Sequence, residues 1–185
     1  MIRSKDRSGW FGASDTYMIM CAGRDTDSFA LWWAEKLGLV RREFTTPAMQ
    51  AGTMYEHRII KACGIRKFDR QIRSRSLRLR VNLDGESRNM VHEVKTHRAD
   101  KPFKVTKAYW LQCQVEMFAV GKACEIIAYG LQAEDYENYY NRIDPGRIER
   151  IPISYDKDFI ENHYLPELRY FAECLKKSEL PKKEK

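Results

Sequence analysis

The sequence lacks the features that would assign it to a membrane or secreted class of protein. No apolar run approaches the roughly 20 residues needed to cross a bilayer. The first ten residues, MIRSKDRSGW, lack the apolar core of a signal peptide. There is also no internal repeat and no low-complexity linker. We therefore expect a cytoplasmic protein that has no membrane partner.

Cysteine is sparse and scattered along the chain. The five cysteines are Cys21, Cys63, Cys113, Cys124 and Cys174, and no two of them form a CxxC pair. Zinc and iron–sulfur sites use such close ligand spacings, so the sequence argues against both kinds of site. Because disulfides are rare in the cytosol, we predict reduced thiols that are mostly buried.

The composition is that of a globular protein with a surplus of positive charge. Of the 185 residues, 43% are hydrophobic, which is enough to build one core, so we expect a single domain over 1–185. The net charge is +7, and a basic tail over about 176–185 is expected to be flexible. A second basic run consists of Arg66, Lys67, Arg70, Arg73, Arg75, Arg78 and Arg80. This run suits either a solvated strand face or contact with a polyanionic substrate.

An acidic motif follows this basic run. Residues 83–95, LDGESRNMVHEVK, place Asp84 at a predicted Asp-Gly turn and Glu93 and Lys95 on a predicted strand. Alternate side chains of a strand share a face, so Glu93 and Lys95 lie together, and the turn would bring Asp84 beside them. Two carboxylates suit Mg²⁺ or Mn²⁺, and a neighbouring lysine suits a water or phosphate, as in metal-dependent phosphodiester hydrolysis. A charged hairpin edge produces the same short pattern by chance, so that alternative stays open.

Apolar periodicity and capping residues predict five helices. They span 14–22, capped by Ser14 or Asp15; 28–37, stopped by Gly38; 47–62; 105–120, ended by Gly121; and about 156–178, with a kink or restart at Pro166. Candidate buried side chains of the second and third helices are Phe29, Leu31, Trp32, Leu37, Met54, Ile59 and Ile60.

The remaining periodic segments predict strands. Apolar and polar residues alternate over 76–83, and further strands are predicted over 90–95, 124–131 and 148–153. The order of elements is helices, a strand pair carrying the acidic motif, a helix, two strands and a closing helix. This order predicts an α/β fold with a central mixed β-sheet flanked by α-helices.

Four segments of the chain resemble, in the same order, the motifs of one nuclease family. They are RSGWFGASD (7–15), AGTMYEHRI (51–59), NLDG with HEVK (82–85 and 92–95) and AYWLQCQVEMFAVG (108–121). From about Arg7 to Leu175 the chain resembles the phage lambda-type exonucleases, the YqaJ-like viral recombinase nucleases of the PD-(D/E)XK superfamily. The resemblance implies a restriction-endonuclease-like PD-(D/E)XK core. Two positions depart from the family pattern. Leu83 stands where the family usually has proline, and Thr96-His97 follows the lysine where the family often has a small residue and then proline.

The resemblance implies a role for each matched residue. The implied metal ligands are Glu56, Asp84, Glu93 and the backbone carbonyl of Val94. Lys95 would position or activate the attacking water, and Gln112 would orient that lysine or a metal-bound water. Arg7 and Ser14 would hold the 5′-phosphate of a DNA end. Tyr109, one turn before Gln112, would line the same site as Gln112 and contribute to DNA binding.

The implied activity is a Mg²⁺-dependent exodeoxyribonuclease, with Mn²⁺ expected to substitute. It would resect double-stranded DNA ends 5′ to 3′ and leave a 3′ single strand for phage-type recombination. A single-strand annealing recombinase would be the partner, a trimer the oligomer implied by the family, and the host cytoplasm the location for a phage-encoded chain. Two alternatives remain: a PD-(D/E)XK endonuclease that cuts internally or at flaps, and an inactive basic DNA-binding protein.

Overall fold

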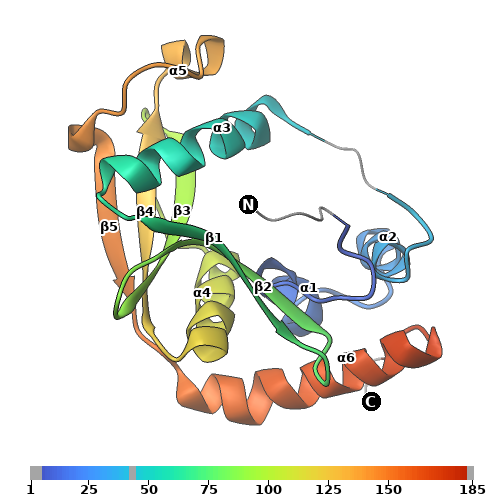
Figure 1. Cartoon of the computed structure of the whole chain (residues 1–185). Helices are drawn as coiled ribbons and strands as arrows, with labels where there is room; N and C mark the ends of the chain where they lie inside the picture. Colours follow the sequence, from blue (N-terminus) through green and yellow to red (C-terminus); the bar gives the residue numbers. More distant parts are fainter. Residues whose placement is uncertain (1–5, 42–44, 183–185) are drawn as a thin grey trace.

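A five-stranded mixed β-sheet forms the centre of the molecule (Figure 1). The computed structural model describes residues 6–41 and 45–182. The strands follow the chain order β1-β2-β3-β4-β5, and only β3 and β4 pair in parallel. Their bounds are β1 Lys67–Ser74, β2 Leu79–Glu86, β3 Met90–Arg98, β4 Ala123–Leu131 and β5 Ile148–Ile153. The predicted α/β architecture, a mixed sheet flanked by helices, is therefore confirmed.

Helices cover both faces of this sheet. The α-helices are α1 Thr16–Met20, α2 Asp27–Lys36, α3 Pro47–Ala62, α4 Lys107–Val120, α5 Ala133–Glu137 and α6 Leu165–Lys177. Short 3₁₀ segments are η1 Ala13–Asp15 and η2 Pro145–Arg147, and η3 Phe159–Tyr164 is a π-helical segment. The predicted bounds of α3 hold because Thr46 caps its start, with Pro47 in the first turn. Helix α4 begins after Thr106 and ends at Gly121, whose φ of 70° suits glycine.

The core is divided by the sheet into two apolar clusters. The larger one packs α1, α2, α4 and α6 against one face, and the smaller one packs α3 against the other face. Two predicted core residues are wrong, because Leu31 is 45% exposed and Met54 is 39% exposed. The face of α2 that is buried carries Phe29, Trp32 and also Trp33, which the sequence pattern did not single out.

Of the two predicted caps of the first helix, Asp15 rather than Ser14 is the N-cap residue of α1. Its carboxylate does not cap α1 but accepts the N–H of Gly12, the cap residue of η1, at 2.6 Å. Asp15 is buried and also accepts from Lys36 Nζ at 2.5 Å and Trp32 Nε1 at 2.8 Å. The hydrogen bonds of Asp15 therefore connect η1 to α2.

The predicted Asp84-Gly85 turn is wrong. Strand β2 continues to Glu86, because Gly85 pairs with Phe68 of β1 and the chain turns only over residues 87–89. Strand β1, formed by part of the basic run, was not predicted as a separate strand. It lies at the edge of the sheet, where half of its side chains are exposed, the other half are only half-buried, and no apolar alternation develops.

The last helix restarts at Pro166 as predicted. The π-helical segment Phe159–Tyr164 precedes the proline, which stands in the first turn of α6. Lys176 and Lys177 of the expected tail belong to α6, and the Lys182 carbonyl accepts from Tyr170 at 3.3 Å. Residues 183–185 of that tail lie outside the described residues. All five cysteines are free, three of them buried, and within the described ranges no helix is long and apolar enough to cross a bilayer.

Candidate active site

The candidate site lies where β2 and β3 separate. These strands pair only at Gly85↔His92 and Glu86↔Val91. Beyond those pairs the ladder stops, and the Val94 N–H donates to Asp84 Oδ2 at 2.9 Å instead of to a backbone carbonyl. The resulting fork brings the Asp84 side chain next to the backbone of the strand that carries Glu93 and Lys95.

Helix α3 brings Glu56 to this fork. A Cβ at Gly52 would lie 3.3 Å from Thr96 Oγ1, so the glycine allows α3 to pack closely on β3. Glu56 follows one helical turn later and is half-buried. Its Oε1 lies 3.8 Å from His57 Nε2, which in turn lies 3.0 Å from Asp69 Oδ1 on β1.

Helix α4 contributes the polar side chains that surround Lys95. The lysine Nζ donates to Glu93 Oε1 at 2.5 Å and to Gln112 Oε1 at 3.2 Å, and it lies 4.9 Å from the centre of the Tyr109 ring. The Gln112 Nε2 donates to Glu116 Oε1 at 2.9 Å. The amide of Gln112 is thereby fixed with its oxygen toward the lysine.

The structure therefore brings together Glu56, Asp84, Glu93, Lys95, Gln112 and Tyr109. It adds Glu116, which is buried and which the sequence analysis did not place in the site. Glu116 lies one turn after Gln112 on α4, and that spacing was the available signal.

Acidic side chains outnumber basic ones in this cluster. Burial raises the pKa of Asp84 well above its usual range, and the neighbouring carboxylates of Glu93 and Glu56 raise it further. Burial and then Glu93 likewise raise the pKa values of Glu56 and Glu116. Burial alone would lower the pKa of Lys95, but the nearby Glu93 carboxylate more than compensates and the pKa is raised. Four carboxylates around one ammonium make a centre that favours cations.

The donor set fits a hard divalent cation. Carboxylate oxygens are the ligands that Mg²⁺ and Mn²⁺ prefer. Glu93 is only 2% exposed, and its Oε2 is buried with no hydrogen-bond partner in the described part of the chain. Such an atom is costly to bury unless a ligand satisfies it, so the residues present fit a bound metal ion.

The predicted phosphate-binding residues lie apart from this cluster. Arg7 and Ser14 are exposed, and within the described ranges neither side chain bonds to the carboxylates. The N–H of Arg80 donates to the Phe11 carbonyl at 2.7 Å, which holds the segment before η1 on β2. Arg80 is 6% exposed, and burial, together with the positive charges of Arg73 and Arg7, lowers its pKa. Arg7 and Arg80 thus form a cationic group beside η1.

Comparison with known proteins assigns the fold. No family model matches the chain, and no curated protein sequence matches it. The chain has the fold of a solved exonuclease structure, with similarity over 93% of its length. That exonuclease is the alkaline exonuclease LHK-Exo from Laribacter hongkongensis, which is 21% identical, is covered over 94% of its length and superposes with a TM-score of 0.62. A structure of LHK-Exo in complex with dAMP is 20% identical, is covered over 90%, and gives a TM-score of 0.64.

Proposed function

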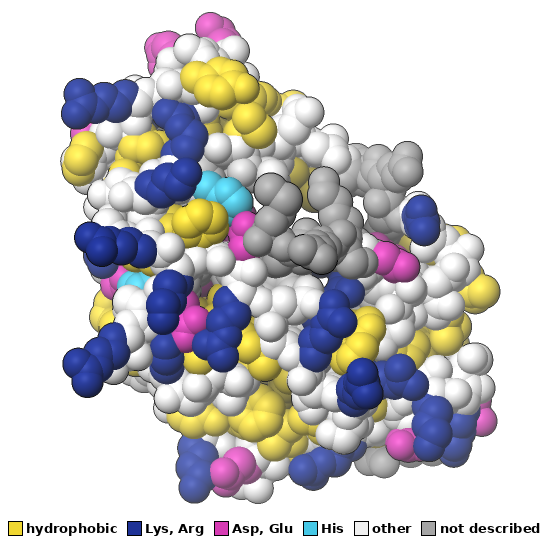
Figure 2. Space-filling view, in the orientation of Figure 1, with side chains coloured by type: hydrophobic (Ala, Val, Ile, Leu, Met, Phe, Trp, Pro, Cys, Tyr) yellow, Lys and Arg dark blue, Asp and Glu magenta, His cyan; other side chains and the backbone are white. Residues whose placement is uncertain are grey.

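We propose that the protein is a metal-dependent exodeoxyribonuclease that acts on the ends of double-stranded DNA. The observation that carries this proposal is the convergence of three matched acidic residues, Glu56, Asp84 and Glu93, with Lys95 at the β2–β3 fork. The fold shared with an alkaline exonuclease supports the same function. Figure 2 shows Lys and Arg side chains along the left side and at the lower right of one face, and this positive charge suits DNA phosphates.

The metal would be held by Asp84, Glu93 and Glu56, with the carbonyl of Val94 as a further ligand. The N–H and C=O of one residue in an extended strand point to the same edge. Since the Val94 N–H is donated to Asp84, its carbonyl also faces the fork. Mg²⁺ is the proposed ion, with Mn²⁺ able to replace it; when bound, it supplies charge stabilisation to the phosphoryl transition state.

Lys95 and Gln112 would position the attacking water. The ammonium of Lys95 donates two of its three N–H groups to the oxygens of Glu93 and Gln112. Its third N–H therefore has a fixed direction and is left to bind a water. Gln112 is itself held by Glu116, which keeps the amide oxygen toward the lysine. Positioning of this kind favours in-line attack on a phosphate lying at the fork. Tyr109 would cover the lysine from one side.

Arg7, Ser14 and the buried Arg80 would bind the terminal 5′-phosphate. Two guanidinium groups and a hydroxyl form a suitable anion site. Capture of the 5′-phosphate would make resection run 5′ to 3′ and leave a 3′ single strand. We further propose, from the family resemblance, a role in phage-type recombination with a single-strand annealing recombinase, and assembly as a trimer.

Digestion of matched DNA substrates tests this function. A linear duplex with a 5′-phosphate, the same duplex without it and a closed circle are incubated with protein in Mg²⁺, in Mn²⁺ and in EDTA. We expect loss of the linear duplexes only, faster with the 5′-phosphate, and none in EDTA. Lys95→Ala should abolish the cutting, whereas Lys101→Ala, which removes an exposed lysine, should not.

The same experiment separates the two alternatives. Cutting of the closed circle would identify an endonuclease, in which Arg7→Ala has little effect. DNA binding without metal-dependent cutting of any substrate would identify an inactive binding protein and would refute the exonuclease proposal.

A further inference from the structure

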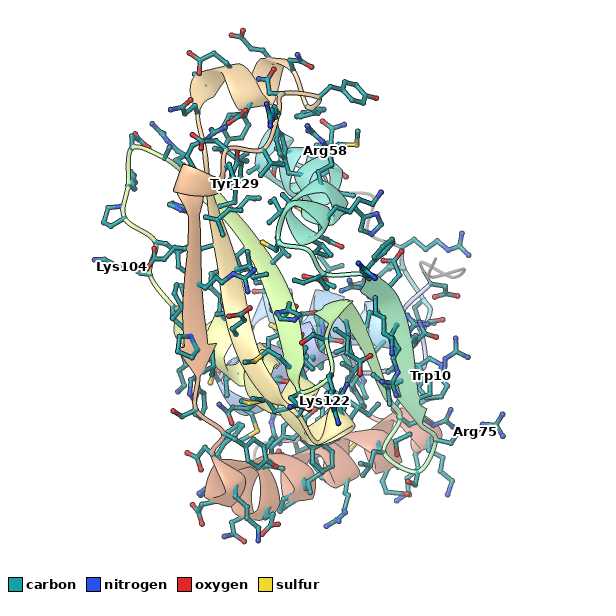
Figure 3. All side chains as sticks on the ribbon, turned by 60° about the vertical axis from the view of Figure 1, so that its left-hand side comes forward. Trp10, Arg58, Arg75, Lys104, Lys122 and Tyr129 are labelled. Carbon is teal, nitrogen blue, oxygen red and sulfur yellow. The ribbon has the colours of Figure 1, made fainter. Side chains whose placement is uncertain are left out.

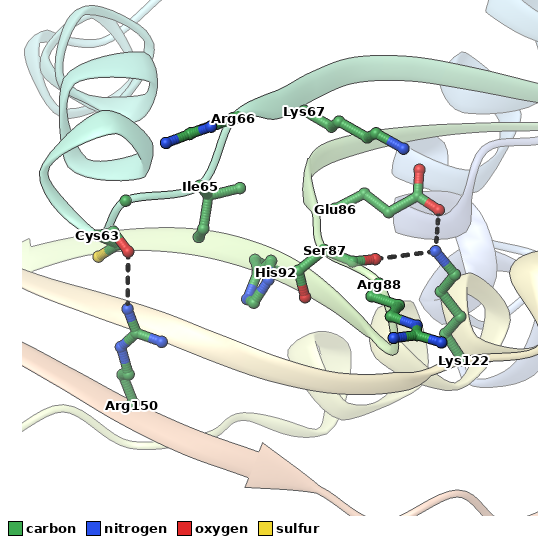
Figure 4. Close-up of a pocket in the computed structure, with 11 residues that line it drawn as sticks. Cys63, Ile65, Arg66, Lys67, Glu86, Ser87, Arg88, His92, Lys122 and Arg150 are labelled. Carbon is green, nitrogen blue, oxygen red and sulfur yellow. Dashed lines mark hydrogen bonds and ion pairs between the residues drawn. The ribbon is translucent and has the colours of Figure 1, made fainter.

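A basic pocket lies beside the β2–β3 turn, and Figure 4 shows the side chains that line it. It has a volume of about 660 Å³ and is formed by the end of α3, the start of β1, the β2–β3 turn, the α4–β4 connection and β5. Five positively charged side chains line it: Arg66, Lys67, Arg88, Lys122 and Arg150. We call this cavity the basic pocket. Its volume lies in the range of small-molecule sites, roughly 300–1,000 Å³.

The charge of the basic pocket is not neutralised by the protein. Lys122 donates to Glu86 and to the Ser87 carbonyl, and Glu86 also accepts from Arg70 on β1. Arg150 donates to Glu125 at 3.1 Å. Across the described residues, no ion pair involves the remaining three cations, Arg66, Lys67 and Arg88. The surplus positive charge calls for an anionic ligand.

The floor of the pocket is fixed and partly apolar. His92 is 4% exposed, and its Nδ1 is bonded to Glu125 Oε1 at 2.8 Å. Its Nε2 is buried with no partner within the part of the chain that the structure describes. Ile65 is buried beside it and Cys63 is half-buried. An apolar floor next to unpaired guanidinium groups suits a planar ring carrying a phosphate.

The basic pocket is separate from the metal-binding cluster. His92 and Glu93 are neighbours on β3, so their side chains point to opposite faces of the sheet. Glu93 faces α4, whereas His92 lies at the pocket beneath the end of α3. Figure 4 shows Arg66 and Lys67 on one side of the cavity, and Arg88 and Lys122 on another.

We propose that the basic pocket binds a phosphate-bearing ligand of nucleotide size at a site distinct from the carboxylate cluster. Arg66, Lys67 and Arg88 contact the phosphate, and the floor at His92 and Ile65 contacts the ring. The site does not depend on the proposed nuclease activity, because its ligand is bound by side chains outside the catalytic cluster.

Calorimetric titration of the full chain with dAMP, in EDTA, tests this site. The pocket variant Arg66→Glu/Arg88→Glu reverses two exposed charges, and loss of one charged contact alone is expected to raise the dissociation constant at least about tenfold. The matched control Arg75→Glu/Arg169→Glu makes the same charge change elsewhere; Figure 3 shows Arg75 extending into solvent beyond the β1–β2 turn. The control should bind like the original chain. Circular dichroism verifies that each variant is folded, and Arg88→Ala alone gives a smaller loss in the same direction.

Three further probes test whether the basic pocket recognises the phosphate of its ligand and whether that phosphate can belong to DNA. Deoxyadenosine, which lacks the phosphate, should bind much more weakly than dAMP, and inorganic phosphate should compete with dAMP. A short single-stranded oligonucleotide that displaces dAMP and is weakened by the same pocket variant would identify DNA phosphates as the source of the ligand. The proposal is overturned if no probe binds, if deoxyadenosine binds as well as dAMP, or if Lys95→Ala rather than the pocket variant removes binding. None of these outcomes depends on DNA cleavage.

Discussion

Replacing Asp84 with asparagine should make the metal-free protein more stable while it removes the proposed activity. The carboxylate lies among Glu56, Glu93 and Glu116, and its raised pKa shows that the folded state disfavours its charge. The asparagine Oδ1 can still accept the N–H of Val94, so the hydrogen bond is kept. The variant therefore removes a repelling charge without opening a cavity.

The size of this effect follows from the surroundings of the side chain. Removal of a repelled charge commonly stabilises a protein by about 0.5–2 kcal/mol, and the lost attraction to Lys95 offsets part of this gain. We expect about 1 kcal/mol, which corresponds to a rise in Tm of about 2–4 °C for a chain of this length. The pKa of Asp84 in the folded chain lies above its ordinary value of 3.8. Ionisation of Asp84 therefore lowers the stability of the original chain as the pH rises from about 4. The advantage of the variant is thus complete at alkaline pH and absent in acid.

Thermal unfolding in EDTA and in Mg²⁺ provides the assay. In EDTA at pH 8 the Asp84→Asn protein should melt above the original chain. Saturating Mg²⁺ should raise the Tm of the original chain only; a concentration of about 100 times Kd contributes about 2.7 kcal/mol. A lower Tm for the variant in EDTA would refute the repulsion argument, and an equal Mg²⁺ effect on both proteins would refute the assignment of Asp84 as a ligand.

Three further substitutions test separate parts of the structure. Burial alone would raise the pKa of Asp135, but the N–H of Gln132 and the Arg147 guanidinium hold it below its usual range. Asp135→Asn should therefore cost about 1–3 kcal/mol at pH 7, and the difference should shrink as the pH falls below about 4; urea unfolding at pH 7 and pH 3 measures it. Gly121→Ala should lower stability by about 1 kcal/mol, because φ is 70° at this helix end, and should leave DNA cleavage unchanged. Arg80→Gln should reduce the preference for a 5′-phosphate about tenfold in paired digestions while an unphosphorylated end is cut as before; equal loss on both ends would contradict the phosphate role.

The sequence predicted the helices whose first or last turn carries a residue typical of a helix end. Helix α3 begins with Thr46-Pro47, and α4 lies between Thr106 and Gly121. The Asp84-Gly85 pair carried an equally plain turn signal, but pairing with β1 outweighed it. There the glycine is needed for close packing, since a Cβ would lie 3.3 Å from that of His92.

The candidate site was predictable where its residues share one strand or one helix face. Glu93 and Lys95 alternate on β3, and their side chains meet at 2.5 Å. The burial of Glu116 and Arg80 depends on which elements pack over them, and no local pattern encodes that. The same limit explains Leu31, since a helix with apolar residues on several sides does not reveal which side is buried.

The short pairing of β2 with β3 also bears on how the molecule folds and opens. Two pairs join the β1–β2 hairpin to the β3–β4–β5 portion of the sheet, whereas β3 and β4 pair along nine positions. The seam between the two portions has few ladder hydrogen bonds, so its amides should exchange with solvent earlier than those of β4. Asp84 and Glu93 lie on opposite sides of that seam. Docking of the hairpin would therefore complete both the fold and the carboxylate cluster, and a metal ion held by residues of both portions would slow their separation.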